Sequence, residues 1–423
     1  MDRPSVFCLR RPRFSWVKSD GCDSSVLKAV GSGTRRGTLS DIELTEVDEL
    51  LFLGRGSFGG MYTGLTPWRA QLKRWGLSWP TAPHKRSGLA KKKRDAASVA
   101  GAAVVNLIEK GIKPSDILSR EAFENAITVS IALEGSTNAV LHLLAIAHAA
   151  NIPLELADFT RIGKRVPVLA DMRPAGKYAM SELIEIGGIQ PLMKMLLAEG
   201  LLHGNCLTVT GKTMAENLAD VPSYPQKQDI IRTMDNPIKK DSHLVVLHGN
   251  LAAEGAVAKI TGNEGLHFTG KAKCYHGEEA AMKAIMDGDV GKGDVVVVRY
   301  EGPRGGPGMR EMLSPTSAIN GRGLSNDVAM ITDGRFSGGS HGFVIGHVTP
   351  EAFDGGVIAL LEDGDEITVD AEKCELNVKL SEAELAERKA KWVRPEPYAT
   401  RGTLAKYAKL VSSASRGAVT DGD

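Results

Sequence analysis

The 423-residue chain has few cysteines, few aromatic residues and no long hydrophobic run. Its five cysteines are scattered with no Cys-X-X-Cys pair, so the sequence indicates neither a zinc knuckle nor a disulfide framework. We therefore expect a reducing compartment. No apolar run approaches the roughly 18 residues that a membrane-spanning helix requires. We expect no membrane partner.

The chain also has no excess of charge of either sign. It carries 52 basic and 51 acidic residues, so nothing draws it as a whole toward nucleic acid or an anionic membrane surface. Its 47 glycines allow backbone to come close to small polar ligands. These balances favour a small-molecule function and no nucleic-acid partner.

The first 37 residues show neither helical nor strand periodicity, and we interpret residues 1–37 as poorly structured. Their basic residues outnumber their acidic ones, a composition that is compatible with an organellar transit peptide. The expected location is mitochondrial if the source is eukaryotic, and otherwise cytoplasmic. A short basic N-terminus without a targeting role is the alternative.

Residues 38–224 are predicted to form a partial α/β domain. Apolar periodicity predicts helices over 96–110 and 138–151. Three further segments have the composition of strands or of buried extended chain; these are residues 153–156, 166–169 and 206–210. Helices that alternate with such segments are typical of α/β domains.

From residue 225 the texture changes to short β-rich runs separated by Gly-Asp, Gly-Asn and Asp-Gly turns. The runs are residues 244–247, 294–298, 328–332, 357–361, 366–369 and 376–380. A capping box at Ser381 predicts a helix to about Trp392. The expected fold class is α/β, with a mainly β, swivelling-barrel-like domain and flanking helices over 225–415, followed by a tail over 416–423.

Residues 53–64 read Leu-Gly-Arg-Gly-Ser-Phe-Gly-Gly-Met-Tyr-Thr-Gly, which is suggestive of a nucleotide-binding loop. A protein kinase would also require a His-Arg-Asp catalytic loop and an Asp-Phe-Gly triplet, and the chain has neither. A dinucleotide fold would require an acidic residue about 20 positions later. Residues 66–79 contain none, so both interpretations are rejected.

Two other short motifs lack residues that their usual functions require. The Thr-Gly-Lys-Thr of residues 210–213 would need a glycine at position 206, which is Cys206. Residues 338–342 fit the nucleophile elbow of hydrolases, which requires an acid and then a histidine downstream. Only His341 and His347 follow Ser340, with no acid before either.

Three polar, glycine-containing segments remain as candidate ligand sites. Two of them, residues 300–312 and 331–342, begin at the end of an apolar strand and then break into glycines. The alternative is that both are simple tight turns. The third, residues 135–138, opens a predicted helix, where free N–H groups favour an anion, although Ser136 or Thr137 could serve only as an N-cap. The helix interior histidines, His142 and His148, are interpreted as packed side chains.

These segments resemble the dihydroxy-acid dehydratase family, with its related sugar-acid dehydratases. The resemblance covers about residues 38–415 and is carried by residues 122–129, 135–142, 208–217, 302–312 and 334–342. It implies a hydro-lyase of isoleucine and valine synthesis that converts 2,3-dihydroxy acids, such as 2,3-dihydroxyisovalerate, into 2-keto acids. It also implies a homodimer.

The resemblance implies specific site residues and cofactors. Ser337 matches the serine that takes the C2 proton, and Glu311 matches a carboxylate that binds Mg²⁺. Mg²⁺ would chelate the substrate carboxylate and C2 hydroxyl, while an iron–sulfur cluster, [2Fe-2S] or [4Fe-4S], would act on the departing C3 hydroxyl. The residues expected to line the substrate pocket are Gly338, Gly339, Ser340, Ser136 and Thr137.

The sequence departs from the family pattern at two positions. Phe58 stands where the family has a cysteine that ligates the cluster, and phenylalanine cannot coordinate iron, so no cluster ligand is matched. Glu134 stands where the family usually has glycine, which is expected to crowd the start of the following helix. Two alternatives therefore stay open: a catalytically impaired, truncated paralogue that lacks the iron–sulfur ligands, or a paralogue of secondary metabolism.

Overall fold

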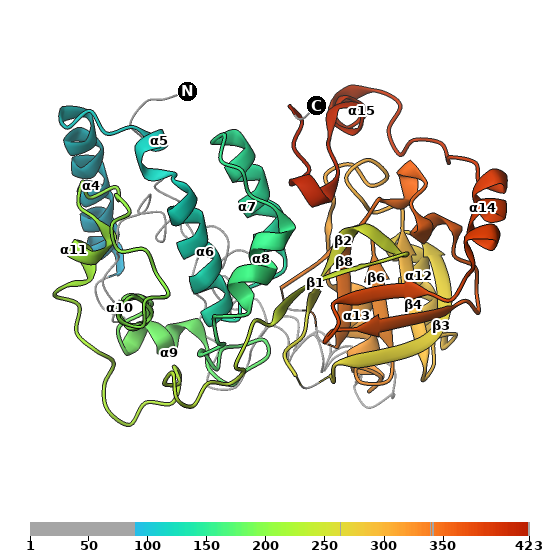
Figure 1. Ribbon diagram of the computed structural model, residues 1–423, viewed down its shortest axis with the longest axis horizontal. Coiled ribbons are helices and arrows are strands. Elements are labelled where there is room, and N and C mark those ends of the chain that lie inside the picture. Colours follow the sequence, from blue (N-terminus) through green and yellow to red (C-terminus); the bar gives the residue numbers. More distant parts are fainter. Residues whose placement is uncertain (1–88, 263, 339, 341, 422–423) are drawn as a thin grey trace.

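The computed structural model of the protein describes residues 89–421 except 263, 339 and 341 (Figure 1). A helical part comes first along this range, and a β-barrel part begins at Leu244. The two parts lie side by side in Figure 1, with α7 and α8 on the side of the helical part nearest the barrel. The glycine-rich residues 53–64, with Phe58, and the N-terminal residues 1–37 lie outside the described residues.

The helical part is built around α6. Its N-cap Ser119 accepts a hydrogen bond from the Ala122 backbone N–H, and the helix is buried almost throughout from Ala122 to its end. The helices of this part are α4 (Leu89–Glu109), α5 (Pro114–Ile117), α6 (Arg120–Ala132), α7 (Asn138–Ala149), α8 (Leu156–Gly163), α9 (Met180–Glu185), α10 (Gln190–Ala198) and α11 (Met214–Leu218). No helix in the described part of the chain is long and apolar enough to cross a membrane.

The two predicted helices are confirmed as α4 and α7. The three segments with strand-like composition are not strands. Residues 166–169 are buried extended chain with one isolated bridge, Val168 to Lys239, because Pro167 has no N–H to donate to a ladder. Residues 206–210 contain one bridge, Leu207 to Thr213, and Leu156 already begins α8. Between residues 89 and 243 the structure therefore shows helices and isolated bridges rather than the alternation of an α/β unit.

The barrel part is a closed sheet in the order β1-β10-β9-β3-β4-β6-β8-β2. Closure leaves no unpaired edge strand. Its strands are β1 (Leu244–Gly249), β2 (Ala252–Lys259), β3 (His267–His276), β4 (Asp294–Arg299), β6 (Ala329–Thr332), β8 (Phe343–Thr349), β9 (Glu366–Asp370) and β10 (Glu375–Val378). This architecture confirms a mainly β second part, while its swivelling subtype and the domain bounds 38–224 and 225–415 remain predictions.

Strand β4 shows why the barrel needs helices outside it. Val295 and Val297 belong to the apolar cluster inside the barrel, whereas Val296 and Val298 belong to a second cluster with residues of α12 and α13. Alternate residues of a strand point to opposite faces, so a run of valines requires cover on both sides. The flanking helices are α12 (Glu278–Asp287), α13 (Ser314–Gly321), α14 (Glu382–Lys391) and α15 (Gly402–Leu410).

Five of the six predicted β-rich runs correspond to barrel strands, and the run at 357–361 does not. It forms the 3-10 helix η4 (Val357–Leu360). Arg299 Nη1 donates hydrogen bonds to the carbonyl of Ala359 at 3.0 Å and to that of the C-cap residue Leu361 at 2.9 Å. The predicted last helix is confirmed as α14, with the Ser381 capping box in place.

The helical part packs directly against the barrel. Leu244 and Val246 of β1 and Val257 of β2 share one apolar cluster with residues of α6, α7 and α8. A polar contact also joins the two parts, because the ring Nε2 of buried His243 lies 2.6 Å from the carbonyl oxygen of Gly135. This contact places the start of α7 against the barrel.

Candidate active site

A short two-stranded sheet brings the two glycine-rich segments of the second part together. Strands β5 (Glu311–Met312) and β7 (Arg335–Phe336) pair in parallel, with Glu311 opposite Arg335. Just beyond β7, the backbone N–H of Ser337 donates to Met312 O at 2.7 Å. The segments predicted as candidate ligand sites therefore form one structural unit, rather than two independent turns.

The start of α7 is attached to the same unit through the fully buried Asn138. Its Nδ2 donates to Glu311 Oε1 at 2.7 Å, to the Phe336 carbonyl at 2.9 Å and to Ser136 Oγ at 3.1 Å. One side-chain amide thus ties the third candidate segment to the other two. No role was predicted for Asn138 itself, although an amide at the start of a helix is a signal that could have indicated one.

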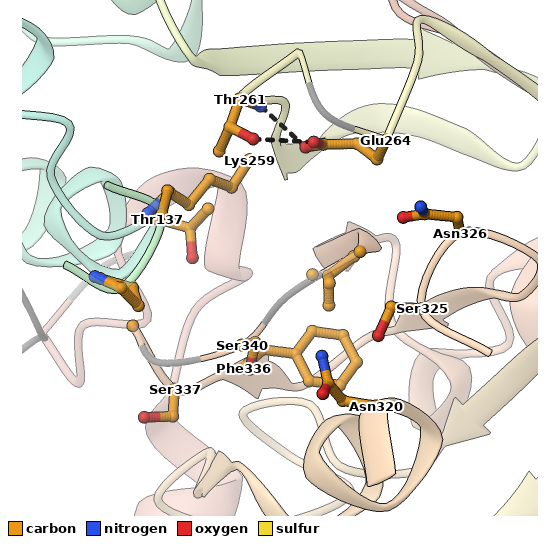
Figure 2. Close-up of a pocket in the computed structure, with 16 residues that line it drawn as sticks. Thr137, Lys259, Thr261, Glu264, Asn320, Ser325, Asn326, Phe336, Ser337 and Ser340 are labelled. Atoms are coloured by element: carbon orange, nitrogen blue, oxygen red, sulfur yellow. Dashed lines mark hydrogen bonds between the residues drawn. The ribbon is translucent and has the colours of Figure 1, made fainter. Parts of the chain in front are cut away.

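A cavity of about 250 Å³ opens between the helical part and the barrel (Figure 2). Its lining includes four predicted pocket residues, Thr137, Ser337, Gly338 and Ser340. The other residues that line it are Pro174, Ala175, Lys259, Thr261, Glu264, Asn320, Ser325, Asn326, Phe336, Gly342, Val344 and Gly346. Glu311 and Ser136 do not line this cavity, and Gly339 lies outside the described residues.

Ser136 and Thr137 have different surroundings. Ser136 is fully buried, and its Oγ accepts the backbone N–H of Asn138 at 3.2 Å, so its hydroxyl belongs to the local structure of the turn. Thr137 is the N-cap of α7, makes no capping hydrogen bond with its side chain and lines the cavity. Of the two predicted substrate contacts, only Thr137 is placed where a ligand could reach it.

Arg335 of β7 contacts two residues of α7. Its Nη1 lies 3.5 Å from His142 Nε2 on α7 and donates to Asn138 Oδ1 at 3.4 Å. Burial lowers the pKa of His142 to about 4 and that of His347 to about 3, and the positive charge of Arg335 acts in the same direction. Both rings are therefore neutral at pH 7, which agrees with the interpretation of His142 as a packed side chain. The same interpretation of His148 is wrong, because its side chain is exposed and its Nε2 lies 3.2 Å from Asp421 Oδ1.

Glu134 occupies a backbone conformation that favours glycine, since its φ is +57°. Its side chain is buried, and burial raises the pKa of the carboxyl to about 7, while the charge of Lys259 opposes the rise. The turn before α7 therefore places a buried carboxyl group and a left-handed backbone at a position that suits glycine, and this is the crowding expected from the sequence.

No group of three or more His, Cys, Asp and Glu side chains converges on a possible metal site within residues 89–421 as described. Glu311 is an exposed carboxylate, a suitable oxygen donor for Mg²⁺, but it belongs to no such group of three or more side chains among those residues. Burial raises the pKa of the thiols of Cys206, Cys274 and Cys374. These thiols are therefore protonated at pH 7.

Comparison with known sequences supplies the class of protein. Residues 1–217 match the family described as dihydroxy-acid/6-phosphogluconate dehydratase N-terminal, and residues 229–418 match its C-terminal counterpart. The chain belongs to this family. The match begins at residue 1, so the similarity extends beyond the predicted residues 38–415 and includes residues 1–37.

Individual relatives agree. The chain is 61% identical over 397 residues to dihydroxy-acid dehydratase of Chromohalobacter salexigens, and this alignment covers 94% of this chain and 69% of the relative. It is 59% identical over 428 aligned positions to the enzyme of Methylococcus capsulatus, covering 100% of this chain and 75% of the relative. Dihydroxy-acid dehydratase 2 of Pseudoalteromonas translucida is 61% identical over 94% of this chain and 70% of its own length.

These matches confirm the predicted family and, with it, the hydro-lyase class. The three relatives are bacterial proteins, and they give no support to a mitochondrial location. The roles of individual site residues remain predictions, because sequence identity over the whole chain does not test them one by one.

Proposed function

We propose that this chain is a dihydroxy-acid dehydratase that converts 2,3-dihydroxy carboxylic acids, such as 2,3-dihydroxyisovalerate, into 2-keto acids in branched-chain amino-acid synthesis. The observation that carries the proposal is the joint placement of Ser337, Gly338, Ser340 and Thr137 on one cavity in a member of this family. A volume of about 250 Å³ accommodates an acid of this size. We further propose that the enzyme is a homodimer whose partners are small-molecule dihydroxy acids, with neither nucleic acid nor a membrane among them.

In this proposal Ser337 accepts the proton from C2 of the substrate. Its backbone is held by the bond from its N–H to Met312 O, and Figure 2 shows its side chain at the edge of the cavity. An uncharged serine hydroxyl is a weak base, so Ser337 would act as the alkoxide, which positive charge near its oxygen stabilises. The C2 proton and the C3 hydroxyl leave together as water and give an enol, which tautomerises to the keto acid.

The family cofactors are part of the proposal. Mg²⁺ would use Glu311 as one oxygen ligand, and a [2Fe-2S] or [4Fe-4S] cluster would assist departure of the C3 hydroxyl. Glu311 is exposed and has the donor chemistry that Mg²⁺ prefers, and its Oε1 is oriented by Asn138. Among the described residues Glu311 belongs to no group of three or more possible metal ligands.

One sequence feature favours a second candidate function. Phe58 occupies the position of a family cysteine, which removes a thiolate that the cluster would need. A catalytically impaired paralogue would keep the cavity and the fold but lose turnover. A paralogue of secondary metabolism would differ only in the dihydroxy acid that it accepts.

Metal analysis combined with an activity assay separates these candidates. The purified chain is analysed for iron and acid-labile sulfide, its visible spectrum is recorded, and keto-acid formation from 2,3-dihydroxyisovalerate is measured with Mg²⁺ present. The dehydratase shows bound iron, visible absorption and product, while the Ser337→Ala control shows the same absorption and no product. A colourless chain without product identifies the impaired paralogue and overturns the proposed activity.

A further inference from the structure

The C-terminal segment, residues 411–421, runs along one face of helix α7 (Figure 1). Its contacts pair the two segments in the same order along the chain: Ala414 with Leu141, Gly417 with Ala145, and Asp421 with His148. Residues three or four positions apart lie on the same side of a helix, so the three α7 partners form one stripe. Asn138, which holds Glu311, lies on this stripe one turn before Leu141. The C-terminal segment therefore follows the face of α7 that carries the candidate site.

The C-terminal segment is also attached to the barrel part. The side-chain hydroxyls of Ser413 and Ser415 donate to Glu254 Oε2 of β2 at 2.8 and 2.9 Å. The carbonyl of the buried Val411 accepts a hydrogen bond from Arg304 Nε at 3.1 Å. Arg304 belongs to the glycine-rich segment that ends at β5. The C-terminal segment thus contacts α7, a barrel strand and that glycine-rich segment at once.

A small apolar cluster joins the same three elements. It consists of the buried Ala414, Leu141 of α7 and Met309 of the glycine-rich segment. Leu141 comes three residues after Asn138, and Met309 comes two residues before Glu311. The cluster therefore lies within one helical turn of the residue that donates to the Glu311 carboxylate, and it ties both partners of that hydrogen bond to the C-terminal segment.

Gly417 is the position at which the C-terminal segment requires glycine. Its φ is +91°, and a Cβ added there would stand 2.6 Å from the backbone nitrogen of Ala145 and 2.9 Å from its Cα. Both are backbone atoms of a helix, so they cannot turn aside as the end of a flexible side chain can. A residue with a side chain at position 417 must therefore move the C-terminal segment away from α7.

We propose that the C-terminal segment positions the candidate site: it holds α7 against the glycine-rich segment, keeps Asn138 on Glu311, and depends on Gly417 for its contact with α7. Residues 411–421 do not line the cavity at Ser337, so they act through α7 and not on the substrate. The effect on the reaction rests on the proposed function, whereas the hold on α7 does not.

Gly417→Ala tests the proposal against a matched control, Gly364→Ala. Gly364 has nearly the same φ, +93°, but nothing lies within 4 Å of a Cβ added there, so alanine brings backbone strain without a collision. Both variants and the wild-type chain are followed by amide hydrogen exchange with mass spectrometry and by keto-acid formation from 2,3-dihydroxyisovalerate. The exchange measurement requires neither cofactors nor turnover.

Gly417→Ala is expected to exchange the amides of residues 138–142 and 309–312 at least about tenfold faster than Gly364→Ala, because α7 opens locally more often. Helix α10, which packs against α11, should exchange alike in both variants. Keto-acid formation by Gly417→Ala should fall at least about tenfold, since small displacements of site residues cost rate on this scale. Equal exchange in the two variants overturns the proposal, and faster exchange with unchanged turnover overturns its link to the reaction.

A second variant covers a Gly417→Ala chain that loosens as a whole, so that α10 also exchanges faster. Glu254→Ala removes the acceptor of both serine hydroxyls at an exposed position of β2. It should speed exchange of residues 138–142 about threefold or more, the scale of one net hydrogen bond, and leave α10 unchanged. No change at residues 138–142 counts against the proposal. A wild-type chain that shows this protection of α7 but forms no keto acid contradicts the proposed function and leaves the hold on α7 standing.

Discussion

The side-chain amide of Asn138 donates to the carboxylate of Glu311 over 2.7 Å, and these two residues are 173 positions apart in the chain. Asn138 begins α7 in the helical part, whereas Glu311 begins β5 beside the barrel. The same amide nitrogen reaches the carbonyl of Phe336, the residue before Ser337. The candidate site is therefore assembled only when the helical part docks on the barrel.

Asn138→Asp should damage this junction. Aspartate has nearly the same shape but loses the amide donor, leaves the Phe336 carbonyl unpaired and puts a second carboxylate next to Glu311. We expect a melting temperature lower by several degrees, since an unsatisfied buried group costs about 1–3 kcal/mol. Keto-acid formation should fall by at least about tenfold.

The matched control is Asn151→Asp just after the other end of α7, where the side chain is exposed and aspartate tolerates the positive φ of 55°. It should change neither melting temperature nor turnover appreciably. Equal behaviour of the two variants would show that Asn138 does not hold the site together.

Ser337→Ala should remove turnover without loosening the fold. The bond from residue 337 to Met312 O is made by the backbone and survives the substitution. Loss of a positioned base typically costs about 10²–10⁴-fold in rate, and we expect a drop of that order in keto-acid production. The melting temperature should stay within about one degree of the wild-type value.

Ser340→Ala is the comparison for this prediction. Ser340 lines the same cavity, and its hydroxyl accepts a hydrogen bond from Thr316 Oγ1 at 3.1 Å. We expect a smaller rate loss, because this hydroxyl lines the cavity and is not the proposed base. A Ser337→Ala chain that is as active as Ser340→Ala would assign the proton transfer to another residue.

Glu134→Gly should stabilise the protein. Glycine accepts a φ of +57° without steric strain, whereas a residue with a Cβ loses about 1–2 kcal/mol there. Glu134→Ala removes the buried carboxyl but keeps the Cβ, so it isolates the backbone effect. We expect Glu134→Gly to melt a few degrees above Glu134→Ala in thermal unfolding, and equal melting temperatures would contradict a strained backbone at this residue.

Stability should depend on pH through the buried Glu351. Its carboxylate accepts the backbone N–H groups of Arg304 and Gly305, each at 2.9 Å, but burial, with the charge of Asp333, raises its pKa to about 8. The pKa of Glu351 is higher in the folded protein than the unfolded value of 4.5, so the protonated carboxyl favours the folded state. This contribution of Glu351 to the free energy of unfolding is complete below about pH 4.5 and is lost as the pH rises to about 8.

Glu351→Gln should remove this dependence. Between pH 5 and pH 8 the melting temperature of the wild-type chain should fall relative to that of the variant, by an amount on the order of a few degrees. Glu362→Gln, at a side chain that is 70% exposed, is the control and should follow the wild-type curve. A wild-type curve that rises relative to Glu351→Gln over this range would give the opposite sign and disprove the assignment.

Several elements were predictable from the sequence because local pattern decides them. The apolar periodicity of residues 138–151 predicts α7, the valine run of 294–298 predicts β4, and the capping box at Ser381 predicts α14. The prediction of a strand at 357–361 is wrong, because a short buried apolar segment has the same composition whether it forms a strand or a 3-10 helix. Strands β2, β3 and β8 are not predicted, because a glycine interrupts each of them and alanine and charged residues weaken the apolar alternation of β2 and β3.

The sequence by itself determined the family of this protein and which short segments carry its polar chemistry, because motif letters and their order survive without coordinates. Only the tertiary structure decided that Thr137 rather than Ser136 reaches the cavity, that Asn138 joins Glu311 to the segment of Ser337, and that the C-terminal segment lies along α7. Those outcomes depend on the docking of α7 against β1 and β2. Electrostatic interactions and hydrogen bonds depend on the distance between atoms in space, and that distance cannot be read from the separation of two residues along the chain.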